Sequence, residues 1–278
     1  MSKITTAVIP LAGFGTRMFP STFFINKAFL PIGKKPIILH LIEEAYEANI
    51  TNFIIIVNNN QINIKNLLVP FANLENNPEV IKYNKLINSI NIKYIIQEKQ
   101  IGLADALLCA KDQIKNEYFS VLLGDCAFIK QDKEYGINNL IKKFNNLNAT
   151  YIGLTKIIDI NMLKAYGVID GKHISDDLIL INNIIEKPTN IPPSNLICAG
   201  RYIFNRSILE IIESLTYPNE ELLLPNVINH ILKKEKVYGV THSTKWLDVG
   251  NELEFIKSNI FYGLSNQEYN KEIKNILY

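Results

Sequence analysis

The chain has 278 residues, of which 47% are hydrophobic and 20% charged, and its formal net charge at pH 7 is +2. These proportions argue for a globular chain rather than a disordered one, and the small charge gives no sign of the basic stripe of a nucleic-acid-binding protein. No run approaches the roughly 20 apolar residues of a membrane span, and the N-terminus lacks the features of a signal peptide. We therefore expect a cytoplasmic protein with no nucleic-acid or membrane partner.

The three cysteines, Cys109, Cys126 and Cys198, are an odd number and lack the spacing of a disulfide framework or a zinc site. We expect free thiols in a reducing compartment.

In the first half of the chain, apolar runs typical of buried strands alternate with helical patterns. The predicted strands are 7–11, 53–57, 92–96 and 119–123, and the predicted helices are 36–48, about 61–68, and 103–114. This alternation predicts an α/β fold with a mainly parallel sheet and helices on both faces. Ligands of such sheets bind beyond the carboxyl ends of the strands, where Gly13 and Asp125 both stand.

After about residue 130 the predicted strands become shorter, which indicates a mixed second lobe. The strands are 150–154, 167–169, 178–185 and 197–204, and the helical patterns are 207–214, 220–232 and 252–261. The segment Trp246–Asp248 would return to the first half of the molecule. The last fifteen residues predict an amphipathic helix, packed either on the body or on a second subunit.

The most informative stretch is the glycine turn L-A-G-F-G-T-R from Leu11 to Arg17, directly after the first predicted strand. Such a turn offers bare backbone N–H groups to an anion, and Arg17 and Lys27 add two cations within reach of one pocket. It is not a dinucleotide fingerprint, because Met18 takes the third glycine position, and the Gly-Lys-Ser/Thr of a P-loop is absent. The residues predicted to hold a triphosphate are Leu11, Ala12, Gly13, Gly15, Thr16, Arg17 and Lys27.

The run G-F-G-T-R-M-F-P-S-T from Gly13, followed by N-K-A-F-L-P from Asn26, resembles the signature of the sugar-1-phosphate nucleotidyltransferases. Within them it is most similar to the glucose-1-phosphate uridylyltransferases. The resemblance implies nucleotidyl transfer from UTP to glucose 1-phosphate, and we expect a homo-oligomer, a dimer or a tetramer. Further matching segments follow in order: G-L-A-D-A from Gly102, L-G-D ending at Asp125, A-Y-G-V from Ala165, E-K-P from Glu186, G-R-Y from Gly200, and W-L-D-V-G-N around Asp248.

The resemblance also implies a Rossmann-like fold with a mixed, mainly parallel central sheet, helices on both faces and a smaller sugar-binding lobe. Residues 1–264 would form a single nucleotidyltransferase domain, followed by a helical tail at 265–278. Within the domain, the nucleotide-binding part would span about 1–130, the sugar-binding part about 131–245, and the return to the metal site 246–264.

Four charged residues would carry the catalysis by resemblance. Asp125 and Asp248 would hold one Mg²⁺ that bridges the α-phosphate and the sugar phosphate, since this ion prefers carboxylates, phosphate oxygens and water. Arg17 would hold the β- and γ-phosphates, and Lys27 would neutralise the α-phosphate. The alternatives are a solvated surface position for each cation and a helix N-cap or turn position for Asp125.

The base and the sugar would each have their own group of residues. Gln97 and Gly102 match the family's base-reading loop, in which a Gln can pair with the imide edge of uracil or thymine through one donor and one acceptor. Glu186 would accept hydrogen bonds from hexose hydroxyls, and Glu221 would support the sugar site or interact with a helix dipole. The sugar-phosphate site would comprise Gly167, Glu186, Lys187 and Gly200.

The chain departs from the uridylyltransferase pattern next to the signature lysine. Asn26 stands where the family usually has proline, Ala28 replaces an acidic residue, and Phe23 and Phe24 replace polar residues. These departures motivate a second hypothesis, a noncatalytic relative that binds a sugar nucleotide or regulates an active partner. A thymidylyltransferase acting on dTTP and glucose 1-phosphate is a third, because the G-L-A-D-A segment would suit either nucleotide.

Overall fold

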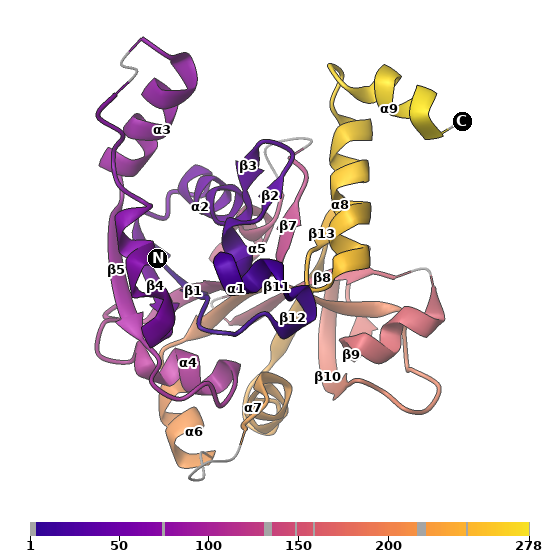
Figure 1. Cartoon of the computed structure of the whole chain (residues 1–278). Coiled ribbons are helices and arrows are strands. Elements are labelled where there is room, and N and C mark those ends of the chain that lie inside the picture. The colour runs from indigo at the N-terminus through magenta and orange to yellow at the C-terminus, as the bar shows by residue number, and fades with distance from the viewer. Residues whose placement is uncertain are drawn as a thin grey trace.

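The structure is a computed structural model, and it describes residues 4–73, 76–130, 135–147, 149–157, 159–215, 221–242 and 244–277. Within these residues a nine-stranded sheet runs through the molecule in the order β5-β4-β1-β6-β11-β8-β12-β10-β9 (Figure 1). The sheet therefore continues from the predicted nucleotide-binding part into the predicted sugar-binding part.

The first half of the sheet is parallel. β1 (Thr6–Pro10) lies between β4 (Asn52–Val57) and β6 (Tyr118–Leu122), and β5 (Asn91–Ile96) pairs with the other side of β4. The inner strands are rich in buried Val and Ile, as expected where both faces of a sheet are covered. Because these strands run in one direction, their carboxyl ends meet at one edge.

The second half of the sheet is mixed, as predicted for the lobe after residue 130, but it leaves the sheet as a whole less parallel than predicted. Among its neighbouring strands only β8 and β12 are parallel, whereas β11 is antiparallel to both β6 and β8, and β10 is antiparallel to both β12 and β9. The apolar pattern along a strand does not encode the direction of its partner, so the prediction holds for the first half only. The strands are β8 (Thr150–Lys156), β9 (Gly167–His173), β10 (Leu178–Glu186), β11 (Leu196–Asn205) and β12 (Val237–Thr241).

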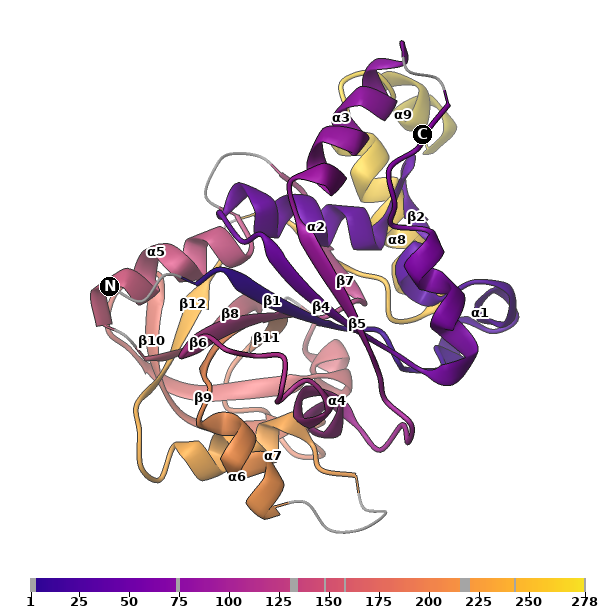
Figure 2. The same cartoon turned by 90° about the vertical axis from the view of Figure 1, so that its left-hand side faces the viewer.

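Helices cover both faces of the sheet, as predicted, and each face has its own apolar core (Figure 2). Leu41 and Leu140 belong to one core, and Leu107 and Val227 belong to the other. The helices on the first face are α2 (Ile37–Glu47) and α5 (Ile137–Leu147), and those on the second are α4 (Leu103–Cys109), α6 (Ile208–Leu215) and α7 (Leu224–Ile231).

Two short pairs of strands lie outside the main sheet. β7 (Cys126–Phe128) pairs antiparallel with β13 (Trp246–Asp248), which brings the return segment beside the end of β6. β2 (Pro31–Ile32) and β3 (Lys35–Pro36) form a hairpin near α8 (Glu252–Ser265).

The C-terminal tail packs on its own chain. α9 (Asn270–Leu277) turns back against α8, and a Cβ at Gly263 would lie 2.1 Å from Cδ1 of Ile273 (Figure 1). The sequence left open whether the tail packs on the body or on a second subunit, and the contact with α8 does not decide between them. No helix among the described residues is long and apolar enough to span a membrane.

Several elements differ from their predicted bounds. The helix α3 (Pro78–Asn88) was not predicted. Its N-cap is Asn77, whose side chain accepts from the N–H groups of Glu79 and Val80. The predicted helix near 61–68 is the 3-10 helix η3 (Asn59–Asn66), and the predicted helix 103–114 ends at Cys109. The predicted helix 220–232 corresponds to α7, and its first residue, Glu220, lies outside the described residues.

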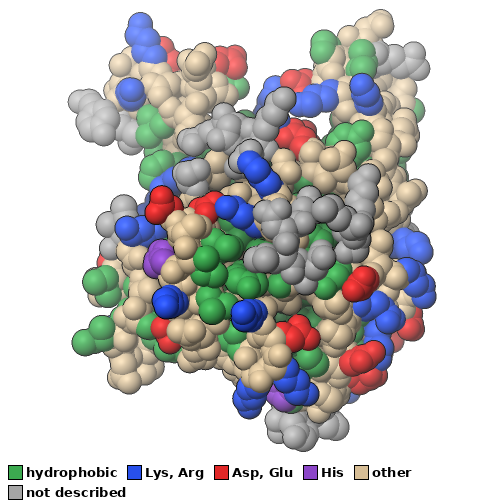
Figure 3. Space-filling view, turned by 180° about the vertical axis from the view of Figure 1, so that it is seen from behind, with side chains coloured by type: hydrophobic (Ala, Val, Ile, Leu, Met, Phe, Trp, Pro, Cys, Tyr) green, Lys and Arg blue, Asp and Glu red, His purple; other side chains and the backbone are tan. Residues whose placement is uncertain are grey.

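Charged side chains of both signs mix on the face seen in Figure 3, around a central group of hydrophobic side chains.

Candidate active site

The glycine turn leaves the carboxyl end of β1 and lines a cavity of about 400 Å³. Gly15 has a φ of +64°, a conformation that strains other residues, and a Cβ there would lie 2.8 Å from Cγ2 of Thr22. The Thr22 hydroxyl donates to the Gly15 carbonyl over 2.9 Å. Around Gly13, by contrast, nothing described lies within 4 Å of where a Cβ would stand. The turn is thus fixed at one glycine and open to a ligand at the other.

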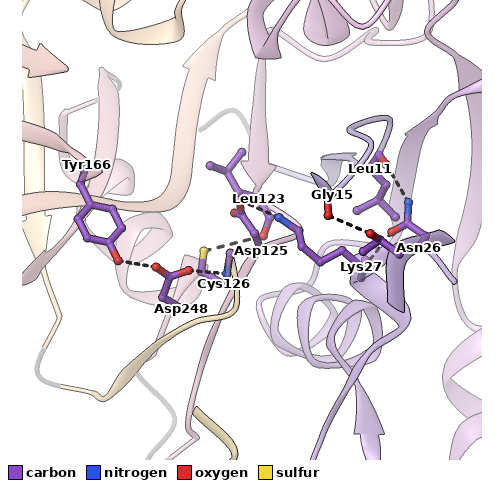
Figure 4. A network of polar contacts seen from close by, with 12 residues as sticks. Leu11, Gly15, Asn26, Lys27, Leu123, Asp125, Cys126, Tyr166 and Asp248 are labelled. Atoms are coloured by element: carbon purple, nitrogen blue, oxygen red, sulfur yellow. Dashed lines mark hydrogen bonds and ion pairs between the residues drawn. The ribbon is translucent and has the colours of Figure 1, made fainter. Parts of the chain in front are cut away.

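Asn26 connects this turn to the signature lysine. Its side chain donates to the Leu11 carbonyl and accepts from the Ala28 N–H, both over 2.9 Å, and so caps the 3-10 helix η2 (Lys27–Phe29) (Figure 4). Its φ of −58° is close to the value that a proline ring imposes. The departure from the family's proline therefore keeps the backbone conformation and adds two hydrogen bonds.

Lys27 and Asp125 form an ion pair across the cavity. Nζ of Lys27 lies 3.2 Å from Oδ2 of Asp125, which follows β6 (Figure 4). Burial raises the pKa of the Asp125 carboxyl, but the positive charges of Lys27 and Arg17 outweigh burial and lower this pKa below its usual value. Asp125 is therefore ionised at neutral pH. It stands in the turn between β6 and β7, so it is not a helix N-cap, whereas the alternative of a turn residue describes its backbone position.

The strand pair β7–β13 places the second aspartate beside the first. Asp248 is paired with Cys126, the residue after Asp125, and the Val249 N–H donates to the Asp125 carbonyl over 2.9 Å. Two residues far apart in sequence are thus brought together, as predicted (Figure 4).

Both carboxylate oxygens of Asp248 accept hydrogen bonds, one from the Gly250 N–H over 2.7 Å and one from the Tyr166 hydroxyl. Burial raises the pKa of Asp248, the two hydrogen bonds lower it, and the Asp125 charge raises it again, with a net increase. A cation between the two carboxylates would favour the ionised form of both. Tyr166 was not predicted as a site residue, although it belongs to the A-Y-G-V motif.

Arg17 and Lys27 were predicted to reach one pocket, but Lys27 lines the first cavity and Arg17 does not. It belongs to the 3-10 helix η1 (Thr16–Met18) and lines a second cavity, of about 260 Å³, together with Asp125 and Asp248. Its Nη2 lies 3.6 Å from where a Cβ of Gly250 would stand. The structure thus places this guanidinium next to the paired carboxylates.

The second cavity also collects most of the predicted sugar-side residues. Gly167, Glu186 and Gly200 line it, and a Cβ at Gly167 would lie 3.0 Å from Oε2 of Glu186. Burial and the nearby Glu221 carboxylate raise the pKa of Glu186, although Lys187 lowers it. Glu221 lines both cavities.

Lys187 stands apart from this group. Its side chain is 66% exposed, its nearest carboxylate is that of Glu186 at 4.0 Å, and it is absent from the described lining of either cavity. Its φ of +47° is unusual for a residue with a side chain, and its N–H donates to the Tyr166 carbonyl over 3.0 Å. The backbone at Lys187 is therefore fixed while its ammonium is free in solvent.

Gln97 closes the far end of the first cavity and is 3% exposed. Its amide nitrogen donates to the Gly102 carbonyl over 3.1 Å and to the Asp105 carboxylate over 2.7 Å. Both amide hydrogens are thus used, and Oε1 remains to accept a bond from a ligand. Asp105, which was not foreseen as a partner, takes an amide hydrogen that was predicted to be available to the base, and the pairing of Gln97 with a base stays a prediction.

A glycine turn, a lysine paired with an aspartate and a second aspartate across a strand pair define a site for phosphorylated substrates. The family model of nucleotidyl transferases matches residues 6–263, and the chain belongs to this family. Within it, the chain is similar to the UTP–glucose-1-phosphate uridylyltransferase of Mycoplasma genitalium, with 33% identity over 98% of this chain and 96% of the relative.

Two further relatives agree with this placement. The putative UTP–glucose-1-phosphate uridylyltransferase of Methanocaldococcus jannaschii is 33% identical, over 98% of this chain and 100% of the relative. The crystal structure of a UDP-glucose pyrophosphorylase complexed with UDP-glucose matches with a TM-score of 0.86 and 27% identity, over 95% of this chain and 100% of that chain.

Proposed function

We propose that this protein transfers a uridylyl group from UTP to glucose 1-phosphate, giving UDP-glucose and pyrophosphate. The observation that carries the proposal is the pair of adjoining cavities, one lined by the glycine turn and the other by Glu186. Asp125 lines both. Two substrates bound in these cavities would meet at this carboxylate, which is the geometry that transfer between them requires.

Charge neutralisation is the main task of the site, because both substrates are anions. Lys27 would neutralise the α-phosphate at the end of the glycine turn, and its pairing with Asp125 holds it in place before substrate arrives. Arg17, beside the two aspartates, would bind phosphate oxygens with its planar fork. No protein nucleophile is needed when a sugar-phosphate oxygen attacks the α-phosphorus directly.

The carboxylate oxygens of Asp125 and Asp248 fit a hard divalent cation, and they would hold Mg²⁺. Burial and, to a smaller extent, the charge of Asp125 raise the pKa of Asp248, and a cation bound between the two carboxylates would oppose both effects. The ion would supply further charge neutralisation at the reacting phosphates.

Gln97 would read the base through Oε1. Uracil and thymine both carry an N3–H that can donate to this oxygen, whereas the N3 of cytosine is an acceptor. The site is therefore expected to reject CTP, and contacts other than Gln97 must separate UTP from dTTP.

A cytoplasmic location is part of the proposal. Cys109, Cys126 and Cys198 are free thiols, and burial raises the pKa of Cys126 to about 12, which keeps it protonated. Thiols of this kind suit a reducing compartment.

The test is a pyrophosphate-release assay with Mg²⁺ that crosses UTP, dTTP, CTP, ATP and GTP with the 1-phosphates of glucose, galactose, mannose and N-acetylglucosamine. We expect UTP with glucose 1-phosphate to give the highest kcat/KM. A higher value with dTTP would replace the proposal by thymidylyl transfer. Binding of UDP-glucose without turnover of any pair would identify a noncatalytic regulator instead.

A further inference from the structure

A fully buried ion pair links β11 to α2 beside the two aspartates. Arg201 is 0% exposed and Glu44 is 1% exposed. Nε and Nη2 of Arg201 donate to the two carboxylate oxygens of Glu44, each over 2.7 Å. The pair is thus bidentate, the geometry that fixes a guanidinium most firmly. Arg201 belongs to the G-R-Y motif, and nothing in the proposed reaction uses it.

The remaining donors of Arg201 reach the start of β7. Nη2 donates to the Cys126 carbonyl and Nη1 to the Cys126 sulfur, both over 3.4 Å, and Nη1 also donates to the Gly200 carbonyl over 3.1 Å. The guanidinium lies over the Phe128 ring, 5.2 Å from its centroid. All five N–H groups of the side chain therefore have an acceptor, and two of these acceptors belong to Cys126.

Cys126 is the residue that joins the two carboxylates. It follows Asp125 directly in the chain and is paired with Asp248 across the β7–β13 ladder. Gly200 allows the close approach, because its φ is +71° and a Cβ there would lie 2.5 Å from the Cys126 sulfur. A shift of Cys126 would therefore move both aspartates relative to each other.

Stability alone does not account for such a pair. Burying two charges is costly, and apolar residues of similar volume often replace a buried ion pair without loss of stability. Glu44 also accepts from the Ile137 N–H over 2.7 Å, at the start of α5, so the network joins α2, α5, β11 and β7. What the ion pair provides beyond packing is a fixed position for one point of the backbone, Cys126.

We propose that Arg201, held by Glu44, is a positioning residue for the metal site: through Cys126 it sets the spacing of the Asp125 and Asp248 carboxylates. The inference rests on the proposed function, in which these two carboxylates hold a divalent cation. Residues that orient metal ligands in this way typically change metal affinity or activity by roughly 10- to 100-fold when they are replaced.

The test measures binding of Mn²⁺ alone to the full chain, by electron paramagnetic resonance or calorimetry, beside steady-state kinetics. Arg201→Lys keeps the charge opposite Glu44 but cannot reach all the acceptors of the planar fork. The double variant Arg201→Met with Glu44→Gln leaves no unpaired buried charge. We expect both to bind Mn²⁺ roughly 10- to 100-fold more weakly than the parent, with a matching loss in kcat. UTP binding without metal is expected to change less than about twofold, since the glycine turn does not touch this network.

His242 provides the matched control. It is buried in the same region, with its ring 4.6 Å from that of Phe128, and neither ring nitrogen has a hydrogen-bond partner among the residues that the structure describes. His242→Leu therefore disturbs the packing around Phe128 without touching the backbone of Cys126. Its Mn²⁺ affinity is expected to equal that of the parent.

Asp125→Asn separates the failure of this inference from the failure of the proposed metal site. Parent-like Mn²⁺ binding in Asp125→Asn would show that the metal site is misplaced. Weak binding in Asp125→Asn together with parent-like binding in Arg201→Lys would overturn the positioning role alone. Arg201→Lys decides the matter if the double variant does not fold, as judged by circular dichroism.

Discussion

The nucleotide side and the sugar side of the site hold their lysines in different ways. Lys27 is 19% exposed and paired with Asp125 at 3.2 Å, and its turn is capped by Asn26. Lys187 is 66% exposed, and its ion-pair partner within the described part of the chain is Glu186, at 4.0 Å. A cation held in place needs no reorganisation when charge develops, whereas a free lysine loses about 2 kcal/mol of rotamer entropy when it is ordered. We therefore expect Lys27 to act mainly on kcat and Lys187 mainly on the KM of the sugar phosphate.

Replacement of Asp125 should have the largest effect, because this residue lines both cavities and is a ligand of the proposed metal ion. Asp125→Asn keeps the shape of the side chain and removes its charge, and we expect kcat to fall roughly a thousandfold or more, since a bound metal supplies several kcal/mol of charge stabilisation. The exposed Asp176→Asn serves as the control and should retain parental activity. Turnover of Asp125→Asn within tenfold of the parent would place the chemistry elsewhere.

Lys27→Met should come next, with a loss in kcat of roughly 10²- to 10³-fold and a smaller change in the KM of UTP. A pH titration of the metal-free protein adds a second readout. In the parent, Lys27 lowers the pKa of Asp125, so the stability from this carboxylate is present above its unfolded pKa and is lost as pH falls through the lowered folded pKa.

Removal of the ammonium leaves burial to raise the pKa of Asp125, opposed by Arg17 and by a backbone hydrogen bond. The folded and unfolded pKa values of Asp125 then differ less, so the stability lost on acidification, followed by urea unfolding across pH, should be smaller in Lys27→Met than in the parent. Superimposable pH profiles would mean that the ion pair has no influence on Asp125 in solution.

A smaller effect is expected at Lys187, and its φ of +47° guides the choice of variant. Lys187→Asn removes the charge while keeping a residue that tolerates this backbone conformation. We expect the KM of glucose 1-phosphate to rise roughly tenfold, while kcat and the KM of UTP stay within about twofold of the parent. This is the result expected when a variant loses a contact that is equally strong in the ground state and in the transition state. Lys172→Asn on β9 is the exposed control. An unchanged KM of glucose 1-phosphate would show that Lys187 is a solvated surface charge, the alternative that its exposure favours.

The contrast between the two sides also separates what the sequence could predict from what it could not. The glycine turn and Lys27 were predictable because each is a local signal at a strand end. The partners of Asp248 were not, since Tyr166 comes from the other lobe and Gly250 depends on the β13 turn. The pairing of Arg201 with Glu44 joins β11 to α2, and no pattern within either segment encodes it.

The sequence could not predict the direction of each individual strand pair, for a similar physical reason. Buried strands show the same apolar runs whether their neighbours are parallel or antiparallel, so the antiparallel pairs around β11 could not be told from the parallel pairs around β1. The amide of Gln97 shows the same limit at the level of one residue. The residue type of Gln97 was informative, but the Asp105 carboxylate, which accepts a hydrogen bond from its amide, lies on the following helix.

The smallest effect is expected at Asn26, where the chain departs from its family. Asn26→Pro suits the local backbone, because φ is −58° at Asn26 and the preceding Ile25 is extended, with φ −144° and ψ 141°. The variant loses the bonds to the Leu11 carbonyl and the Ala28 N–H, so its free energy of unfolding should fall by about 1 kcal/mol while kcat stays within about threefold. Asn26→Ala, which lacks both the cap and the ring, should lose more stability than Asn26→Pro. A large rise in kcat in Asn26→Pro would instead show that the departure restrains catalysis, and would bring the chain closer to the regulatory alternative. We expect no such rise, since Lys27 is already paired with Asp125 in the presence of Asn26.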